Sequence, residues 1–348
     1  MGYGHWSRKS FETYSASMGR TVSAEGHLDS KLTDQQLFVQ RVLHPRLDPK
    51  NVMRECCDSD EHPASIPVIL ALDVTGSMGS AAAEVAKKLN EVMTKLYGRI
   101  KDVEFLVMGI GDLAYDRAPI QISQFESDIR IAEQLDLVYM EHGGGGNIFE
   151  SYTAAWYMGL HHTKLDCWKR GKRGLIITMG DEPMNPYLPK DPLARATGDP
   201  IQADVETAAL YQETLPKYDL YHLHVNHRKN DNYWPQVQRS FGAQLEQGHL
   251  ERVTVDEISD AIVRIVTAHA ENPAAAPVQP ATPGEISWDT GEKAKDTPPV
   301  DKEDTIPVGL PTAEEISWDT GAKEPDAPGK EKGKDEKKKK GLFGLFNW

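Results

Sequence analysis

Three side chains with oxygen donors follow one another at two-residue spacing in the segment Asp73-Val74-Thr75-Gly76-Ser77. At this spacing the hydroxyls of Thr75 and Ser77 can face the same side as the Asp73 carboxylate. Oxygen donors that carry little negative charge suit a hard cation such as Mg²⁺, and Mn²⁺ and Ca²⁺ accept similar donors. We therefore predict a divalent-metal site that includes Asp73, Thr75 and Ser77.

The elements on either side of this segment are expected to hold it at one end of a sheet. Residues 66–72 form a continuous apolar run, which is typical of a strand covered on both faces. Apolar residues from Val85 to Leu96 keep helical spacing, and Gly98 is placed to end that helix. Asp73 therefore follows the carboxyl end of a buried strand, which is where doubly wound sheets bind ligands.

The alternation of strands and helices predicts the fold class. Further strands are expected over residues 105–110, 119–122, 175–178 and 218–225, the second of them at a sheet edge. Further helices are expected over residues 128–135, 152–160, 204–214 and 234–241, with a last one after Thr254. This pattern predicts an α/β domain over residues 61–271, with a doubly wound, mainly parallel sheet and helices on both faces.

An N-terminal arm, residues 1–60, precedes this domain. Its first half is polar and lacks sustained periodicity, so we interpret it as a mobile or draped segment. A helix is predicted over residues 33–43, because Thr33 and Gln36 form a capping box ahead of apolar residues.

The segment from Asp73 to Gly79, between a buried strand and an amphipathic helix, resembles the metal-ion-dependent adhesion site of von Willebrand factor A domains. The family pattern is Asp-x-Ser-x-Ser, and Thr75 keeps the hydroxyl of the middle serine. The resemblance covers residues 64–270 and implies a binding module with bound Mg²⁺, not an enzyme. In the family an Asp or Glu of a partner protein completes the coordination of the ion, so the resemblance implies such a partner here.

The second loop of the family site differs in this chain. The family takes a threonine after a pair of glycines, but residues 143–151 have Gly146 where that threonine is expected. Three residues are candidates to replace it, directly or through water: Asn147, Glu150 and Ser151. We rank Asn147 among the predicted metal-site residues.

The third loop differs as well. The family has Thr-Asp-Gly after its strand, whereas residues 178–183 place Asp181 two positions later. Asp181 is therefore expected to reach the ion through a water molecule. Asp112 and Asp116 follow another strand, where they either rim the site or cap a turn. The stretches 58–63, 111–119 and 143–152 also resemble a subgroup of bacterial and phage proteins of this family.

Composition restricts the partners and the compartment. A formal net charge of −14 and a pI of about 5.3 argue against nucleic-acid binding, which depends on a basic surface. Three cysteines, two of them adjacent, do not form a disulfide framework. Because no apolar run suits a signal peptide or a membrane span, we expect a cytoplasmic protein.

Residues 272–348 have the composition of a disordered tail, with ten of the 22 prolines and few aliphatic residues. The peptide Glu-Ile-Ser-Trp-Asp-Thr-Gly occurs there twice, at residues 285–291 and 315–321. We interpret both copies as partner-binding motifs, because an exposed tryptophan reduces solubility unless a partner buries it. The residues expected to make these contacts are Trp288, Asp289, Trp318 and Asp319. A duplication without a role, and a self-ligand in which either aspartate reaches the metal of its own or a neighbouring chain, remain open.

The end of the tail, residues 337–348, joins four lysines to an apolar, aromatic peptide that contains Phe343, Phe346 and Trp348. Such a peptide suits an anionic membrane surface or the groove of a second partner. A lysine run kept for solubility is the alternative. On the first interpretation the protein is peripheral to a membrane through its C-terminus.

Other functions are compatible with parts of the sequence. A nucleotide- or phosphate-binding α/β domain is the main alternative, because a strand, a turn and a helix N-terminus can hold phosphate, yet the glycine-rich and Walker patterns are absent. Ser77 resembles a hydrolase nucleophile, but Thr75 stands where that motif requires glycine. His222 and His224 are interpreted as residues that fill a strand edge or pair with neighbouring acids, in preference to zinc ligands.

Overall fold

The computed structural model describes residues 4–29, 33–141, 147, 149–229 and 231–271. The chain divides into two units, residues 1–283 and 284–348, and every described residue belongs to the first. The predicted tail motifs and residues 143–146 of the glycine run lie outside the described residues. Within the described part of the chain, no helix is long and apolar enough to cross a membrane.

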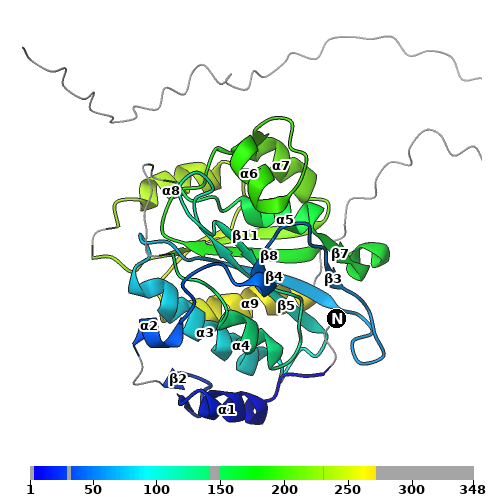
Figure 1. Cartoon of the computed structure of the whole chain (residues 1–348). Helices are drawn as coiled ribbons and strands as arrows, with labels where there is room; N and C mark the ends of the chain where they lie inside the picture. Colours follow the sequence, from blue (N-terminus) through cyan, green and yellow to red (C-terminus); the bar gives the residue numbers. More distant parts are fainter. Residues whose placement is uncertain (1–3, 30–32, 142–146, 148, 230, 272–348) are drawn as a thin grey trace, which may run out of the picture. The chain divides into compact units, whose positions relative to one another are not determined.

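A six-stranded sheet forms the centre of the domain (Figure 1). Its strands lie side by side in the order β12 (Leu250–Val253), β11 (Tyr218–Val225), β8 (Gly174–Gly180), β4 (Ile66–Asp73), β5 (Val103–Ile110) and β6 (Ile120–Ile122). All neighbours pair in parallel except β5 and β6, because β6 is an antiparallel edge strand. The chain starts in the middle at β4, runs to one edge and returns to the other half at β8. This doubly wound order confirms the predicted fold class and makes the β4–β8 boundary the switch point.

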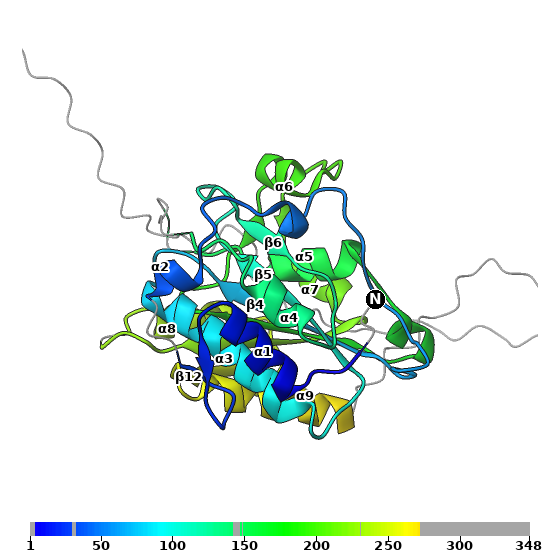
Figure 2. The same ribbon diagram turned by 60° about the horizontal axis from the view of Figure 1, so that its bottom comes forward.

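Helices cover both faces of the sheet (Figures 1 and 2). One face carries α3 (Ser80–Leu96), α4 (Arg130–Leu135) and α9 (Ile258–Glu271). The other carries α5 (Ala154–His161), α7 (Thr207–Thr214) and α8 (Trp234–Gly242), with α6 (Lys190–Thr197) further out. The predicted capping box at the start of α9 is present, since the backbone N–H and the hydroxyl of Thr254 both donate to the Glu257 carboxylate at 2.9 and 2.8 Å.

The alternation of side chains along β4 determines where residues 73–77, the predicted metal-binding segment, lie. Val68, Leu70 and Leu72 pack in the core on the α3 side, whereas Ile69 and Ala71 pack on the α5 side. All five side chains are fully buried, which explains why the strand reads as a continuous apolar run. Asp73 continues the second series and so points to the α5 side.

The N-terminal arm contains more structure than its sequence predicts. It holds α1 (Arg8–Ser17), a hairpin of β1 (Thr21–Val22) and β2 (Leu28–Asp29), α2 (Asp34–Leu37), a 3-10 turn (Pro45–Leu47) and β3 (Arg54–Cys56). Trp6 and Phe11 anchor the arm in the α3-side core, with ring centroids 5.2 Å apart. Only two residues of α1 are buried, so its periodicity is weak. The helix predicted over 33–43 is one turn long, although Thr33 N–H does donate to Gln36 Oε1 at 2.8 Å.

Several short elements were not predicted from the sequence. They are β7 (Thr163–Leu165), which pairs with β3, a 3-10 turn (Asp166–Arg170), β9 (Tyr187–Leu188), which pairs with β10 (Val205–Glu206), and the helix α6. The edge strand β12 was also missed. Only Val253 of its four residues is buried, so β12 lacks the apolar run by which the inner strands were recognised.

A buried carboxyl group on β5 gives the fold a pH dependence. Glu104 is 1% exposed, and its Oε2 has no hydrogen-bond partner among the described residues. Burial raises the pKa of Glu104 to about 6, from an ordinary value of 4.5. The neutral form is therefore favoured by folding. The contribution of this group to the free energy of unfolding is fully present below pH 4.5 and is lost as the pH rises through 6.

We expect Glu104→Gln to remove this dependence. Relative to the wild type, the variant should gain about 2 kcal/mol in the free energy of unfolding between pH 4.5 and pH 7.5. Urea unfolding at both pH values measures the difference. Glu213→Gln, which changes an exposed carboxylate, is the control and should follow the wild type. Equal pH dependence in Glu104→Gln and the wild type would contradict the assignment.

Candidate metal site

The carboxylate of Asp73 is buried and held at both oxygens. Its Oδ1 accepts hydrogen bonds from the backbone N–H of Thr75 at 2.9 Å and from Thr75 Oγ1 at 2.7 Å. Its Oδ2 accepts a hydrogen bond from the hydroxyl of Tyr152 at 2.6 Å. Asp73 is 0% exposed, so these three donors replace the water that its carboxylate loses on folding.

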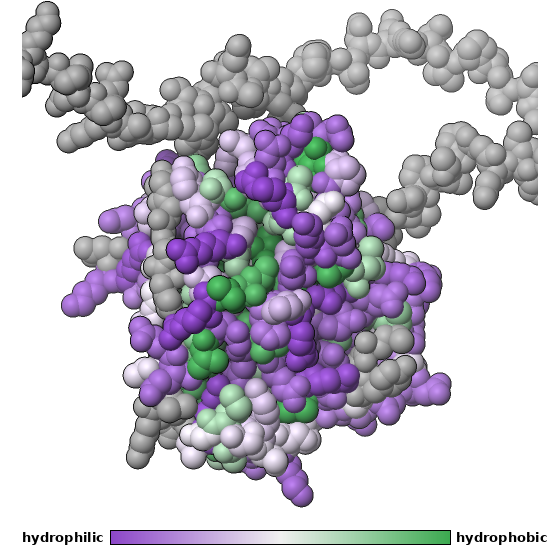
Figure 3. All heavy atoms as spheres, in the orientation of Figure 1, coloured by the Kyte–Doolittle hydropathy of each residue, from purple (hydrophilic) through white to green (hydrophobic). Residues whose placement is uncertain are grey.

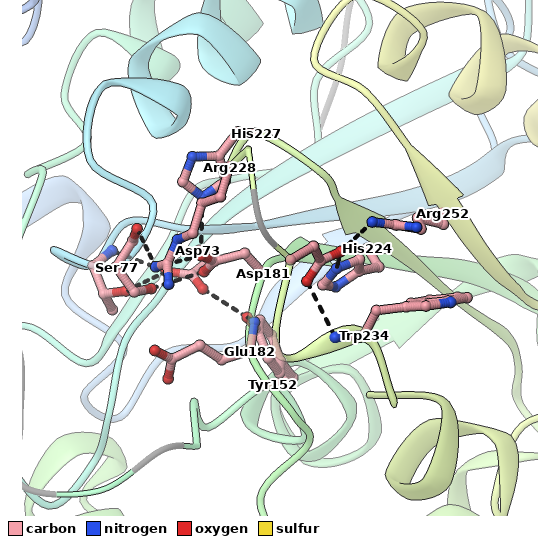
Figure 4. A network of polar contacts seen from close by, with 12 residues as sticks. Asp73, Ser77, Tyr152, Asp181, Glu182, His224, His227, Arg228, Trp234 and Arg252 are labelled. Atoms are coloured by element: carbon pink, nitrogen blue, oxygen red, sulfur yellow. Dashed lines mark hydrogen bonds and ion pairs between the residues drawn. The ribbon is translucent and has the colours of Figure 1, made fainter. Parts of the chain in front are cut away.

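A chain of oxygen atoms runs from Asp73 to the loop that follows β8 (Figure 4). Thr75 Oγ1 lies 3.1 Å from Ser77 Oγ, and Ser77 Oγ donates to Asp181 Oδ1 at 2.8 Å. The structure therefore brings together four of the five predicted metal-site residues: Asp73, Thr75, Ser77 and Asp181. Because β4 and β8 are adjacent parallel strands, their carboxyl ends place the two loops side by side.

The turn into α3 depends on Gly79. Its φ of 54° and ψ of −131° are costly for residues that carry a Cβ atom, and its N–H donates to the carbonyl of Gly76 at 3.1 Å. Gly79 is also the N-cap residue of α3 and has no side chain to cap the helix. The tight turn keeps Ser77 beside Asp73.

Asn147, the fifth predicted residue, makes other contacts. Its amide Nδ2 donates to Asp112 Oδ2 at 2.6 Å, and its Oδ1 accepts from the N–H of Phe149 at 3.1 Å. Ser151, another candidate from this loop, accepts the N–H of Leu113 at 3.0 Å. Neither side chain contacts the oxygen chain, because both fasten their own loop to the loop after β5.

Buried acids gather around Asp73. Glu150 and Glu182 are 6% and 8% exposed, and Oε2 of Glu150 has no hydrogen-bond partner among the described residues. Burial and the neighbouring charge of Asp73 raise the pKa of Glu182 to about 8 and raise the pKa of Glu150 further. Burial, and then the charge of Asp181, raises the pKa of Asp73 to about 7. Burial thus favours the neutral forms of these acids, and a bound cation would favour their charged forms.

The donor set fits a hard divalent cation. Two carboxylates and two hydroxyls supply only oxygen, and the unpartnered carboxylate oxygen of Glu150 lies in the same acidic surroundings. Within the described ranges no group of three or more His, Cys, Asp or Glu side chains is arranged to hold a metal. A metal bound here would therefore depend on the hydroxyl oxygens of Thr75 and Ser77.

Two basic residues that the sequence prediction did not include contact Asp181. Its Oδ2 lies 2.9 Å from His227 Nε2 and 2.7 Å from a guanidinium nitrogen of Arg228 (Figure 4). Both residues follow β11, the neighbour of β8, so their loop ends at the same edge of the sheet. A correct prediction of the strand order would have placed this loop beside Asp181, whereas no local motif does so.

Tyr152 was also missed as a site residue, because it was predicted only as an apolar position of a helix. Its ring is fully buried and lies against Gly180, while its hydroxyl holds Asp73. A buried tyrosine usually pairs its hydroxyl, which is the one signal that could have pointed to this role.

The two strand histidines are paired with other side chains. His222 Nδ1 lies 2.9 Å from Thr178 Oγ1, and its ring stacks on Phe241 with centroids 3.7 Å apart. His224 Nε2 lies 2.7 Å from Asp231 Oδ2. His222 therefore packs within the core, whereas His224 pairs with an acid.

Part of the surface of the domain is apolar. Figure 3 shows apolar atoms near the middle of one face, surrounded by hydrophilic ones. A hollow of about 350 Å³ lies between residues 43–50, 113–120 and 192–196. Tyr115, in the loop after β5, is 55% exposed.

Gly180→Ala should disturb the support of Asp73. A Cβ atom at this position would lie 2.0 Å from the hydroxyl oxygen of Tyr152, and the ring is fully buried. We expect the variant to lose about 1–3 kcal/mol in the free energy of unfolding, measured with urea. Gly242→Ala, where a Cβ atom meets nothing within 4 Å, is the control. Equal stability of the two variants would contradict this packing.

Comparison with known proteins gives structural likeness only. No family model and no curated protein matches the sequence. Solved structures similar to this chain include the pilus adhesin SpaC of Lactobacillus rhamnosus GG, with a TM-score of 0.42, 10% identity and coverage of 64% of this chain and 31% of that chain. The vWF domain of the pilus tip protein Mfa5 of Porphyromonas gingivalis has a TM-score of 0.38 and 12% identity, with coverage of 62% of this chain and 98% of that chain. The SpRpn10 VWA domain has a TM-score of 0.34 and 11% identity, with coverage of 55% of this chain and 87% of that chain.

This chain thus spans about a third of the length of the SpaC adhesin. Two of the three descriptions name a von Willebrand domain, the family that the Asp73 segment resembles. At these TM-scores the likeness carries no further argument. The doubly wound fold is established by the strand order of the chain itself.

Proposed function

We propose that this chain is a metal-dependent protein–protein interaction module. Asp73, Thr75, Ser77 and Asp181 hold Mg²⁺ in this proposal, and a partner protein supplies an Asp or Glu side chain. The observation that carries it is the oxygen chain that links the β4 and β8 loops at the switch point of the sheet. Mn²⁺ and Ca²⁺ are alternative ions for the same oxygen donors.

The proposed division of roles follows from the contacts. Asp73 supplies the negative charge, and the Tyr152 hydroxyl fixes its orientation. Thr75 and Ser77 add neutral oxygens, and Asp181 orients the Ser77 hydroxyl. A divalent cation bound there supplies positive charge and open coordination positions that a carboxylate can occupy. Two carboxylates balance the charge of a divalent cation, so in this proposal the partner carboxylate binds through the open coordination positions of the ion.

The same contacts favour binding over catalysis. A serine nucleophile is usually activated by a histidine base, whereas the hydroxyl of Ser77 contacts Thr75 and Asp181.

The contacts of Asp73 also disfavour the alternative of a nucleotide- or phosphate-binding domain. At the turn where such domains hold phosphate with backbone N–H groups, the N–H of Thr75 donates to the Asp73 carboxylate instead.

Metal binding should appear as a rise in stability that requires Asp73. At a Mg²⁺ concentration of about 100 times Kd, binding adds about 2.7 kcal/mol, and the melting temperature should rise by about 5–10 °C. Asp73→Asn keeps the shape of the side chain, removes its charge and should abolish the rise. Asp191→Asn, at an exposed carboxylate, should keep it. Equal rises in Asp73→Asn and the wild type would contradict the site.

Partner binding should share these requirements. A protein retained on the immobilised wild type in Mg²⁺ should be released by EDTA and should not be retained by Asp73→Asn. Retention that persists both in EDTA and with Asp73→Asn would contradict the proposed role of the metal. Nucleotide in place of metal should leave the melting temperature unchanged, and a nucleotide-dependent rise would favour the alternative function.

The tail is proposed to make separate contacts in a cytoplasmic protein. The repeats around Trp288 and Trp318 suit a second protein partner, and the peptide with Phe343, Phe346 and Trp348 suits an anionic membrane. The full chain should float with vesicles that contain phosphatidylserine, and the double variant Phe343→Ser/Phe346→Ser should not. Flotation that survives this change, or no flotation of the wild type, would contradict the membrane contact.

A further inference from the structure

Arg228 joins the loop after β11 to both loops of the candidate metal site (Figure 4). One guanidinium nitrogen lies 2.7 Å from Asp181 Oδ2 and donates to the backbone carbonyl of Ser77 at 2.6 Å. The opposite oxygen of Asp181 accepts the Ser77 hydroxyl. A cationic side chain of the protein thus already occupies the charge environment that the proposed function assigns to a metal ion.

The exposure of the two partners shows which of them can move. The side chain of Asp181 is 4% exposed, whereas that of Arg228 is 37% exposed. Asp181 is therefore fixed in the domain, but the guanidinium can turn into solvent without opening the core. The ring of Tyr233, with its centroid 5.5 Å from the Arg228 guanidinium carbon, adds a third, weaker contact.

We propose that Arg228 is an internal competitor for the divalent cation and sets the metal affinity of the site. This inference rests on the function proposed above. A positive charge held at Asp181 repels a second cation in the same partly buried site, where charges interact more strongly than in water. By thermodynamic linkage, the contact that weakens metal binding is itself weakened when metal binds.

The neighbouring cations supply matched controls. Lys229 follows Arg228 directly and is exposed, and no contact of its side chain with the site is observed. Arg252 is paired with Asp231 at 2.9 Å, outside the oxygen chain. Replacement of Lys229 therefore removes one positive charge from the same loop without touching Asp181 or Ser77.

Titration calorimetry with MgCl₂ tests the inference on the full-length wild type, Arg228→Gln, Arg228→Lys and Lys229→Gln. We expect Arg228→Gln to bind Mg²⁺ about tenfold more tightly than the wild type. Arg228→Lys, which keeps the charge, should return the affinity toward the wild-type value. Lys229→Gln should stay within about twofold of the wild type, because its charge is solvated and screened. Melting curves without metal verify that each variant is folded.

The outcomes separate the inference from the function on which it rests. Unchanged or weaker Mg²⁺ binding by Arg228→Gln, with clear binding by the wild type, would overturn the competitor role and leave the proposed function standing. Tighter binding in Arg228→Lys equal to that of Arg228→Gln would also overturn it, since charge would then not be the cause. If neither the wild type nor Arg228→Gln binds Mg²⁺, both the function and the inference fail.

Discussion

The burial of one carboxylate, that of Asp73, constrains the whole carboxyl edge of the sheet. A charged group at the end of a fully buried strand loses its water and must find donors or a cation within the protein. Tyr152 and Thr75 supply the donors, and the close packing of Tyr152 on Gly180 keeps the first of them in place. The local structure therefore supplies hydrogen bonds to both oxygens of this carboxylate, and a cation site at this edge would depend on the carboxylate.

The doubly wound topology determines which loops can help. The loops after β4, β8 and β11 meet because these strands are adjacent and parallel. They bring Ser77, Asp181 and Arg228 together from distant parts of the sequence. The loop after β5 contributes Asp112 and Asp116, which lie near Glu150 without entering the oxygen chain. The site thus holds more acidic groups than its hydroxyl-rich motif suggests, and Arg228 pairs with one of them, Asp181.

The sequence allowed the central part of this arrangement to be predicted. The apolar run of β4 marked a strand buried on both faces, and the spacing of Asp73, Thr75 and Ser77 showed their common side. It did not reveal Arg228, because no motif links that residue to the site; only the adjacency of β11 and β8 does. The strand β12 was missed because an edge strand with one buried residue has no apolar pattern. Asn147 was chosen for its position after the glycines, but its amide contacts Asp112 instead.

Anomalous diffraction from crystals soaked in MnCl₂ tests the central claim most directly, because Mn²⁺ takes the same oxygen donors as Mg²⁺ and can be located without assumptions about binding energy. The account predicts an anomalous peak in contact with the Asp73 carboxylate and with the hydroxyl oxygens of Thr75 and Ser77. A well-ordered site without such a peak would contradict it. So would a peak held only by other acids, such as Asp112.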